Sequence, residues 1–306
     1  MVTVAPSAAG FSTDELRRDL QAISGARRIK NLVMTILMGL SVAVVVVVLL
    51  FVLGTLLSKG LSIVFADFPA WFTTDIPLTP RREGPGMKAA IVGTIVITAV
   101  ATAIAVPLGI LGAIYLNEYG KTNRFARVLR FLSNVMAGVP SIVMGMFIYL
   151  FWLVPRGGLN GFSGALALAL LMLPIVVRSS ELMLQLVPQN LRDASYALGA
   201  SESRTSLRVV VPNAAPGMVS GCLLAIARAA GETAPLLFTI GAAKATNWNP
   251  FEGANTALSM QIYGNAKESY DPAQQRAWGA ALTLVALSFM FTLLARVVTA
   301  RLSKNR

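Results

Sequence analysis

Apolar residues in this chain form long blocks of bilayer length, not the 3.6-residue stripe of a soluble amphipathic helix. Charged residues punctuate the chain between these blocks. Each block is near the ~20 residues that a helix needs to cross a bilayer. The pattern predicts six spans, at about residues 32–57, 89–116, 131–154, 161–180, 214–240 and 278–298. The expected fold class is therefore all-α, a polytopic membrane protein with six transmembrane helices.

Composition supports this class and removes others. The 306 residues are 55% hydrophobic and only 13% charged, with a mean hydropathy of +0.67, which excludes an ordinary soluble domain. Cys222 is the single cysteine and the chain has no histidine, so thiol and imidazole ligands for a metal are lacking and no metal site is expected. We expect a tail at residues 1–31 and one transmembrane domain at residues 32–306.

The distribution of basic residues predicts the orientation of the spans. Placing both termini in the cytoplasm puts most Lys and Arg residues on the cytoplasmic side, as the positive-inside rule requires. The net charge of +12 then reflects topology, so it does not call for a nucleic-acid partner. The lipid bilayer is the expected surrounding.

Two ionisable residues interrupt the fifth apolar block. Arg228 and Glu232 stand four residues apart within the run from Cys222 to Ile240. A charge inside the bilayer costs about 2.5–3.5 kcal/mol on insertion scales and usually faces a bundle interior or a watery path. Two interpretations remain open, a polar path and a buried ion pair. Arg178, near the cytoplasmic end of the fourth span, either lines such a path or pairs with Glu181.

Prolines are expected to break four of the six spans, at Pro107, Pro140, Pro174 and Pro235, and the two singled out as helix breaks are Pro140 and Pro235. Each removes one main-chain hydrogen bond, and Pro235 leaves the carbonyl of Gly231 without its helical donor. Such gaps survive in a membrane only where protein or water satisfies them. One proline alone indicates ordinary kinking, but four are typical of a transport protein.

No nucleotide site is predicted. Gly120-Lys121-Thr122 has the ending of a phosphate-binding loop, but Tyr115 stands where that loop requires glycine. Without histidine a Ser-His-Asp set is impossible, so we expect no enzyme. If ATP is used, ATP and Mg must be bound by partner ATPase subunits, and this chain carries no cofactor.

The loop at about residues 181–213 carries the most specific motif. It resembles the EAA loop of bacterial ABC-importer permeases, Glu-Ala-Ala, three residues, Gly, nine residues, then Ile-x-Leu-Pro. The spacing is met throughout, with Asp193 in place of Glu and Ser195 in place of the second Ala. The motif positions here are Asp193, Ala194, Ser195, Leu198, Gly199 and Pro212.

This motif predicts a helix, a turn and a second helix. Asp193 suits the first turn of the first helix, Gly199 permits a sharp turn, and Pro212 is expected to stop the second segment before the fifth span. The resemblance implies that this element docks on an ATPase subunit and transmits its closure to the membrane helices.

Three further stretches resemble one branch of these permeases, the PstA type of phosphate-specific importers. They are Gly138–Gly145, Leu173–Arg178 and Ala227–Thr239, and the resemblance covers roughly Ile91 to Leu294. It implies a type I ABC importer permease fold, a bacterial cytoplasmic membrane location, and a phosphate path that includes Arg178, Arg228 and Glu232.

The resemblance also implies partners. They are a second permease subunit (PstC-like), two ATPase subunits (PstB-like) and an extracytoplasmic phosphate-binding protein (PstS-like). The alternatives are a permease for another oxyanion, such as sulfate or molybdate, and a secondary transporter. Glu232 could accept a proton that phosphate carries and sulfate lacks, or it could neutralise Arg228.

The outer loop, about 241–277, holds a short helix that serves either as a docking surface or as packing on the bundle.

Overall fold

The computed structural model describes residues 25–120 and 123–304. Contacts divide the chain into two compact units, Met1–Thr55 and Leu56–Arg306, and the candidate site lies in the second. Within the described ranges the elements are helices, and no strand occurs. The expected all-α fold class is thus confirmed. Five helices are long and apolar enough to cross a membrane, or six with the bent pair counted as one span.

The N-terminal helix α2 is longer than the predicted first span. It runs from Gly25 to Ala66, so residues 25–31 are helical and not part of a tail. The rest of the predicted tail, residues 1–24, lies outside the described residues. Arg and Lys are good helix formers, which explains the early start. The helix ends shortly before Pro69, where a proline disfavours helical backbone in the preceding residue.

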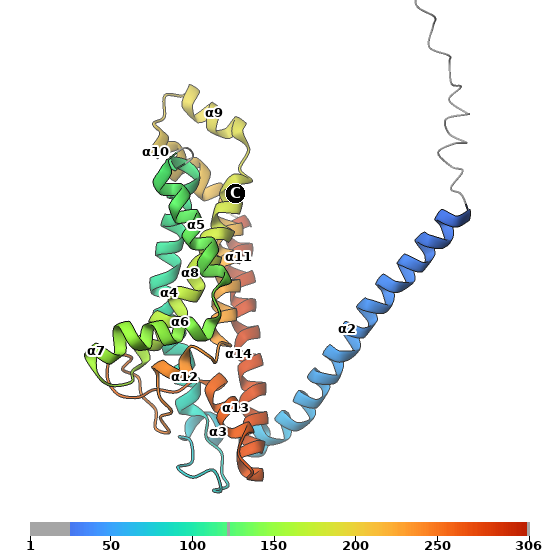
Figure 1. Ribbon diagram of the computed structural model, residues 1–306, viewed down its shortest axis with the longest axis vertical. Coiled ribbons are helices and arrows are strands. Elements are labelled where there is room, and N and C mark those ends of the chain that lie inside the picture. The colour runs from blue at the N-terminus through green and yellow to red at the C-terminus, as the bar shows by residue number, and fades with distance from the viewer. Residues whose placement is uncertain (1–24, 121–122, 305–306) are drawn as a thin grey trace, which may run out of the picture. The chain divides into compact units, whose positions relative to one another are not determined.

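The second unit contains the remaining helices, and Figure 1 shows α9 and α10 at one end of them with α3 and α13 at the other. Three short π-helical segments are denoted η. The main helices of the predicted spans are α4 (Lys88–Ile114), α5 (Arg124–Gly138), α6 (Ser141–Ile148), α8 (Gly161–Gln185), α11 (Val211–Ala230) and α14 (Asp271–Lys304). The short elements are α3 (Ala70–Thr73), η1 (Tyr115–Tyr119), η2 (Tyr149–Leu153), α7 (Val154–Arg156), α9 (Gln189–Ala197), α10 (Glu202–Thr205), η3 (Ser206–Val210), α12 (Leu236–Thr239) and α13 (Leu258–Ala266).

The third predicted span is a bent pair of helices. The helix α5 begins at Arg124, well before residue 131, because Asn123 caps it by accepting a hydrogen bond from the main-chain nitrogen of Phe125. The chain then bends by 107° between α5 and α6. The bend falls at Pro140, one of the two residues at which the sequence most clearly predicts a break.

Two of the four prolines do not break their helices, contrary to the sequence prediction. Pro107 lies inside α4 and Pro174 inside α8, and both helices continue past them. A proline in a long helix removes one hydrogen bond and can be absorbed as a kink when packing holds the flanking turns. The fifth predicted span does break, since α11 ends at Ala230 and the short α12 resumes after Pro235.

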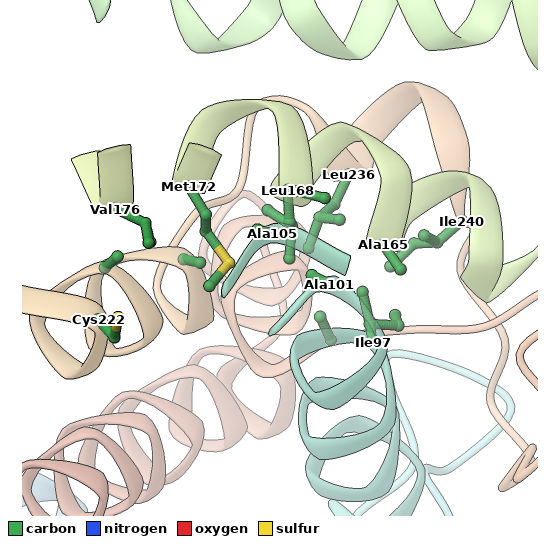
Figure 2. Close-up of a cluster of buried hydrophobic side chains, with 14 residues drawn as sticks. Ile97, Ala101, Ala105, Ala165, Leu168, Met172, Val176, Cys222, Leu236 and Ile240 are labelled. Carbon is green, nitrogen blue, oxygen red and sulfur yellow. The ribbon is translucent and has the colours of Figure 1, made fainter. Parts of the chain in front are cut away.

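One apolar core of the second unit is formed by α4, α8, α11 and α12. Figure 2 shows small side chains of α4, including Ala101 and Ala105, close to Leu168 and Met172 of α8. A Cβ added to Gly109 would lie 2.6 Å from Cγ1 of Val176, so the two backbones approach closely. Small residues at membrane helix interfaces allow such approach. The result is a tightly packed frame that positions the site.

Helix α3 and the loop that follows it are held by polar contacts to α14, which begins at Asp271 and not at 278. The indole nitrogen of Trp71 donates to Oγ1 of Thr283 at 3.0 Å. The guanidinium of Arg276 donates to the carbonyls of Pro80 and Arg82 at 2.9 and 2.7 Å. The loop that precedes α4 is therefore anchored to the start of α14.

Candidate translocation and coupling site

Arg228 and Glu232 form an ion pair across the end of a helix. Arg228 lies in the last turn of α11, whereas Glu232 follows its end at Ala230, so the pair does not lie along one continuous helix as expected. Nε of Arg228 is 3.6 Å from Oε1 of Glu232, and the side chains are 69% and 20% exposed. Exposing a guanidinium to lipid would be costly. This geometry favours a watery path or a partner subunit over Arg228, in preference to a buried ion pair.

The backbone beside this pair is irregular. The main-chain nitrogen of Glu232 donates to the carbonyl of Ala229 at 3.1 Å and closes the last turn. The nitrogen of Leu236 then donates to the carbonyl of Thr233 at 3.1 Å and opens the next helical turn. Irregular backbone within a membrane protein is tolerated where it is covered by protein or lines a water-filled cavity. The break places Glu232 at such a point.

The two broken spans meet at a glycine. A Cβ on Gly145 of α6 would lie 2.5 Å from Cα and 2.7 Å from the carbonyl oxygen of Pro235. Helix α6 begins just after Pro140, so the structure brings together the segments that follow the two predicted breaks. The absence of a side chain at Gly145 permits this backbone contact.

The outer-loop helix α13 packs on the bundle. The main-chain nitrogen of Leu258 donates to Oγ1 of Thr94 in α4 at 2.9 Å, and Leu258 is fully buried. Oγ of Ser259 donates to the carbonyl of Glu232 at 2.9 Å. Of the two interpretations of this loop, the structure therefore supports packing on the bundle, and it adds a direct contact to the break.

Arg178 lies in a second cluster of charges. Its Nη1 is 3.9 Å from Oε2 of Glu181, the pairing considered from the sequence, and its side chain is 62% exposed. The sequence did not indicate Arg130, whose Nε is 2.8 Å from Oε1 of the same carboxylate. Arg178 is not near a helix end, since α8 continues to Gln185. A small cavity of about 30 Å³ lies beside these three side chains, about the volume of one water molecule.

The arginines at 178 and 228 lie at different levels of the bundle. Helices α8 and α11 are antiparallel neighbours, because Gly221 faces Ser179 and Gly217 faces Met183. This register places Arg178 beside residue 222, six residues from Arg228, or about 9 Å along the axis at 1.5 Å per residue. The structure does not gather Arg178, Arg228 and Glu232 into one pocket.

The motif residues form the expected helix, turn and helix. Asp193, Ala194 and Ser195 lie in α9, but Asp193 is past its first turn, contrary to the prediction, and accepts from Nε2 of Gln189 at 3.1 Å. Leu198 ends the helix and is 89% exposed. The turn has Gly199 at φ +80°, in the region that favours glycine, and a Cβ there would meet no atom within 4 Å.

Pro212 does not end the second helix, which is a correction. Helical backbone runs from Glu202 through η3 into α11 without interruption, and Pro212 stands in the first turn of α11. The preceding π-helical turn bonds the nitrogen of Val211 to the carbonyl of Ser206. Nδ2 of Asn213 donates to the carbonyl of Val209 at 2.7 Å and satisfies a group beside the proline. The helix that follows the turn at Gly199 is thus continuous with the fifth span.

A buried polar network links this element to α4. Oε2 of Glu118 accepts from Nη1 of Arg192 at 2.5 Å and from Oγ of Ser206 at 3.0 Å. Nη2 of Arg192 also donates to the carbonyl of Leu184 at 3.1 Å. The local sequence pattern does not predict a contact among Glu118, Arg192 and Ser206. The available signal was Glu118, an acid at the very end of an apolar block.

Comparisons with known proteins agree with this architecture. The family described as binding-protein-dependent transport system inner membrane component matches residues 105–304. Phosphate transport system permease protein PstA 1 of Mycobacterium tuberculosis (strain CDC 1551 / Oshkosh) is 42% identical over 274 residues, covering 89% of this chain and 89% of that protein. PstA of Haemophilus influenzae is 39% identical over 257 residues, covering 84% and 89%.

Solved structures show the same fold. The MetNI methionine ABC transporter in an inward-facing conformation aligns with a TM-score of 0.55 and 20% identity, over 70% of this chain and 93% of that chain. At this identity the likeness speaks for the fold alone. The chain has the permease fold of ABC importers.

Family and fold together settle the class of protein. The relatives are permease subunits and not enzymes, so ATP hydrolysis belongs to a partner ATPase. A secondary transporter is not supported, and the chain is a multi-pass membrane protein that works with other components of an ABC transporter. This chain belongs to the family of binding-protein-dependent transport system inner membrane components and, within it, to the PstA group of permeases.

Proposed function

We propose that this chain is the permease subunit of an ATP-driven importer of inorganic phosphate, in which it forms half of the translocation path. The observation that carries the proposal is the exposed Arg228 beside Glu232 at the break in the fifth span. It occurs in a chain 42% identical to relatives named phosphate transport permeases. A permease for sulfate or molybdate is not favoured by these relatives.

Phosphate chemistry fits the two residues. The guanidinium of Arg228 offers planar donors to an oxyanion, and Glu232 neutralises it when no anion is present. Because Glu232 is 20% exposed and its oxygen lies 3.6 Å from Nε, an incoming anion competes with a loose pair and not with a tight buried one. Arg178, about 9 Å away along the axis, offers a second exposed guanidinium on the same route.

The coupling element receives energy from outside the chain. In this proposal two ATPase subunits (PstB-like) bind ATP and Mg and hold α9, and a second permease subunit (PstC-like) completes the path. A phosphate-binding protein (PstS-like) delivers the anion to the outer face. Both termini lie in the cytoplasm of a bacterial cell, with the spans in its cytoplasmic membrane. Closure of the ATPase subunits moves α9, and the membrane helices rock to open the inner side.

The test uses the assembled complex in proteoliposomes, with ATP inside, radiolabelled phosphate outside and the binding protein present. Arg228→Gln should abolish uptake although the complex assembles, whereas Arg127→Gln, an exposed arginine on α5, should leave uptake intact. The double change Arg228→Gln with Glu232→Gln removes both charges together. Uptake restored in the double variant would show that Arg228 serves only the ion pair. An excess of sulfate or molybdate should not reduce uptake, and strong competition would favour the other oxyanions.

A further inference from the structure

The carboxylate of Glu118 connects three elements at the end of the bundle that carries α9 and α10 (Figure 1). Glu118 belongs to η1 at the end of α4, Arg192 to α9 and Ser206 to η3. Nδ2 of Asn117 donates to its second oxygen at 2.6 Å. These four side chains are at most 7% exposed. A single acid thus accepts from a coupling helix, from the base of the fifth span and from its own neighbour.

We propose that the pair of Glu118 and Arg192 is the joint that carries movement of the coupling helix α9 into the membrane helix α4. The inference rests on the proposed function, because it assumes that an ATPase subunit moves α9. Neither residue touches the substrate, so both are positioning residues.

The backbone alone connects α9 loosely. Residues 186–188 join α9 to α8, and the turn at Gly199 joins it to α10. Main-chain hydrogen bonds shape that turn and the hydroxyls of Ser195 and Thr205 are 2.8 Å apart across it, but no atom lies within 4 Å of a Cβ at Gly199, so nothing packs on the glycine. A push on α9 could be absorbed in both connections. The bonds from Arg192 to Glu118 and to the carbonyl of Leu184 prevent this, because one guanidinium holds α9 to the ends of α4 and α8 at once.

Stability alone is a poor explanation for this pair. Burying two charges costs free energy, and an apolar pair of similar size is often as stable or more so. What the guanidinium adds is a defined geometry, because its two Nη atoms donate to different acceptors, Oε2 of Glu118 and the carbonyl of Leu184. Two π-helical segments, η1 and η3, supply Glu118 and Ser206, and such segments occur often at functional sites. Movement of α4 then reaches the core shared with α8 (Figure 2).

The experiment compares coupling and not only activity. The reconstituted complex carries Arg192→Lys, Ser206→Ala or the paired change Glu118→Gln with Arg192→Gln. Lysine keeps the charge, but its single nitrogen on a flexible stem lacks the planar fork whose two Nη atoms bond to Glu118 and to the carbonyl of Leu184. Phosphate uptake and ATP hydrolysis are each measured per assembled complex. We expect phosphate transported per ATP to fall about tenfold in Arg192→Lys and in the paired variant, and less in Ser206→Ala. The control Thr283→Val removes a buried hydrogen bond from Trp71 at the other end of the bundle and should leave the ratio unchanged.

A second readout does not depend on the substrate. A spin label is placed at the exposed Tyr119 in η1 by Tyr119→Cys, in a Cys222→Ala background. ATP binding should shift the label's spectrum in the otherwise unmodified complex and not in Arg192→Lys. If variants that assemble show an unchanged ratio of phosphate transported to ATP hydrolysed and an unchanged label response, the proposal that Glu118 and Arg192 transmit the movement of α9 is wrong. Lower amounts of complex at an unchanged ratio would show a purely structural role. The unmodified complex could take up no phosphate while its label still responds to ATP and loses that response in Arg192→Lys. That result would contradict the proposed phosphate transport but would support the role of Glu118 and Arg192 in transmitting movement.

Discussion

A substitution at Gly199 changes the backbone strain of the turn without causing a steric collision. The residue has φ +80°, and a Cβ built there meets no atom within 4 Å, so a new side chain causes no collision. Main-chain bonds define the turn, from Gly199 to Tyr196 at 2.9 Å and from Ala200 to Ser195 at 3.1 Å. The full cost of a substitution is therefore that of holding an L-residue in the left-handed region.

That cost has a known size. A left-handed conformation costs an L-residue about 1–2 kcal/mol, and strained backbone positions reach about 3 kcal/mol. Asn tolerates the region best, Ala pays the ordinary penalty, and Val adds a β-branch. A free-energy difference of about 1.4 kcal/mol changes a population ratio tenfold. Gly199→Ala should therefore lower the population of the native turn, relative to other conformations of the turn, about fivefold to thirtyfold. Gly199→Val should lower it further.

The assay follows from the position of the turn between α9 and the helix that enters the fifth span. Uptake per ATP hydrolysed should fall in the order Gly, Asn, Ala, Val, while the amount of chain in the membrane stays constant because no span is altered. Equal coupling in the Gly199→Val and unmodified complexes would refute the reasoning. So would a fall in membrane abundance that accounts for all lost uptake.

Two further changes test the contacts around the break. Gly145→Ala should force α6 away from the backbone of Pro235, at a cost of about 1–3 kcal/mol, and reduce assembled complex and uptake. Gly138→Ala is its matched control, since a Cβ there meets nothing within 4 Å, and equal losses in both would contradict the argument. Ser259→Ala removes the donor to the carbonyl of Glu232, and the KM for phosphate uptake should rise at unchanged complex abundance. An unchanged KM would show that this hydrogen bond does not position the break.

Apolar blocks locate the membrane helices well because burial in lipid is a local property of each segment. The sequence places prolines in four spans and singles out Pro140 and Pro235, but it gives no physical reason why the helices persist at Pro107 and Pro174. Pro174 is buried in α8, and Pro107, itself exposed, lies between Ala105 and Gly109 of α4, which pack on α8, so both helices persist. Pro235 contacts Gly145 of α6, the helix that begins just after Pro140. That difference depends on tertiary packing and not on the proline itself.

The charge pairs also differ in how far the sequence predicts them. Arg228 with Glu232 and Arg178 with Glu181 are close in sequence, so helical spacing indicates both pairs, although Glu232 lies beyond the end of α11. Glu118 and Arg192 are 74 residues apart, and only the folded chain brings them together. Their pairing was beyond any argument from local spacing.

Helix α4, together with the turn that follows it, contacts both the segments around the break in the fifth span and the coupling helix α9. Near its start Oγ1 of Thr94 accepts from the nitrogen of Leu258, whose neighbour Ser259 holds the carbonyl of Glu232. Just past its end Glu118 holds the coupling helix. The two contacts are 24 residues apart, or about 36 Å of helix. A displacement at Glu118 can therefore reach the break through one packed element, provided that α4 moves as a rod. Pro107, which α4 carries without breaking, is the point at which such a rod would bend first.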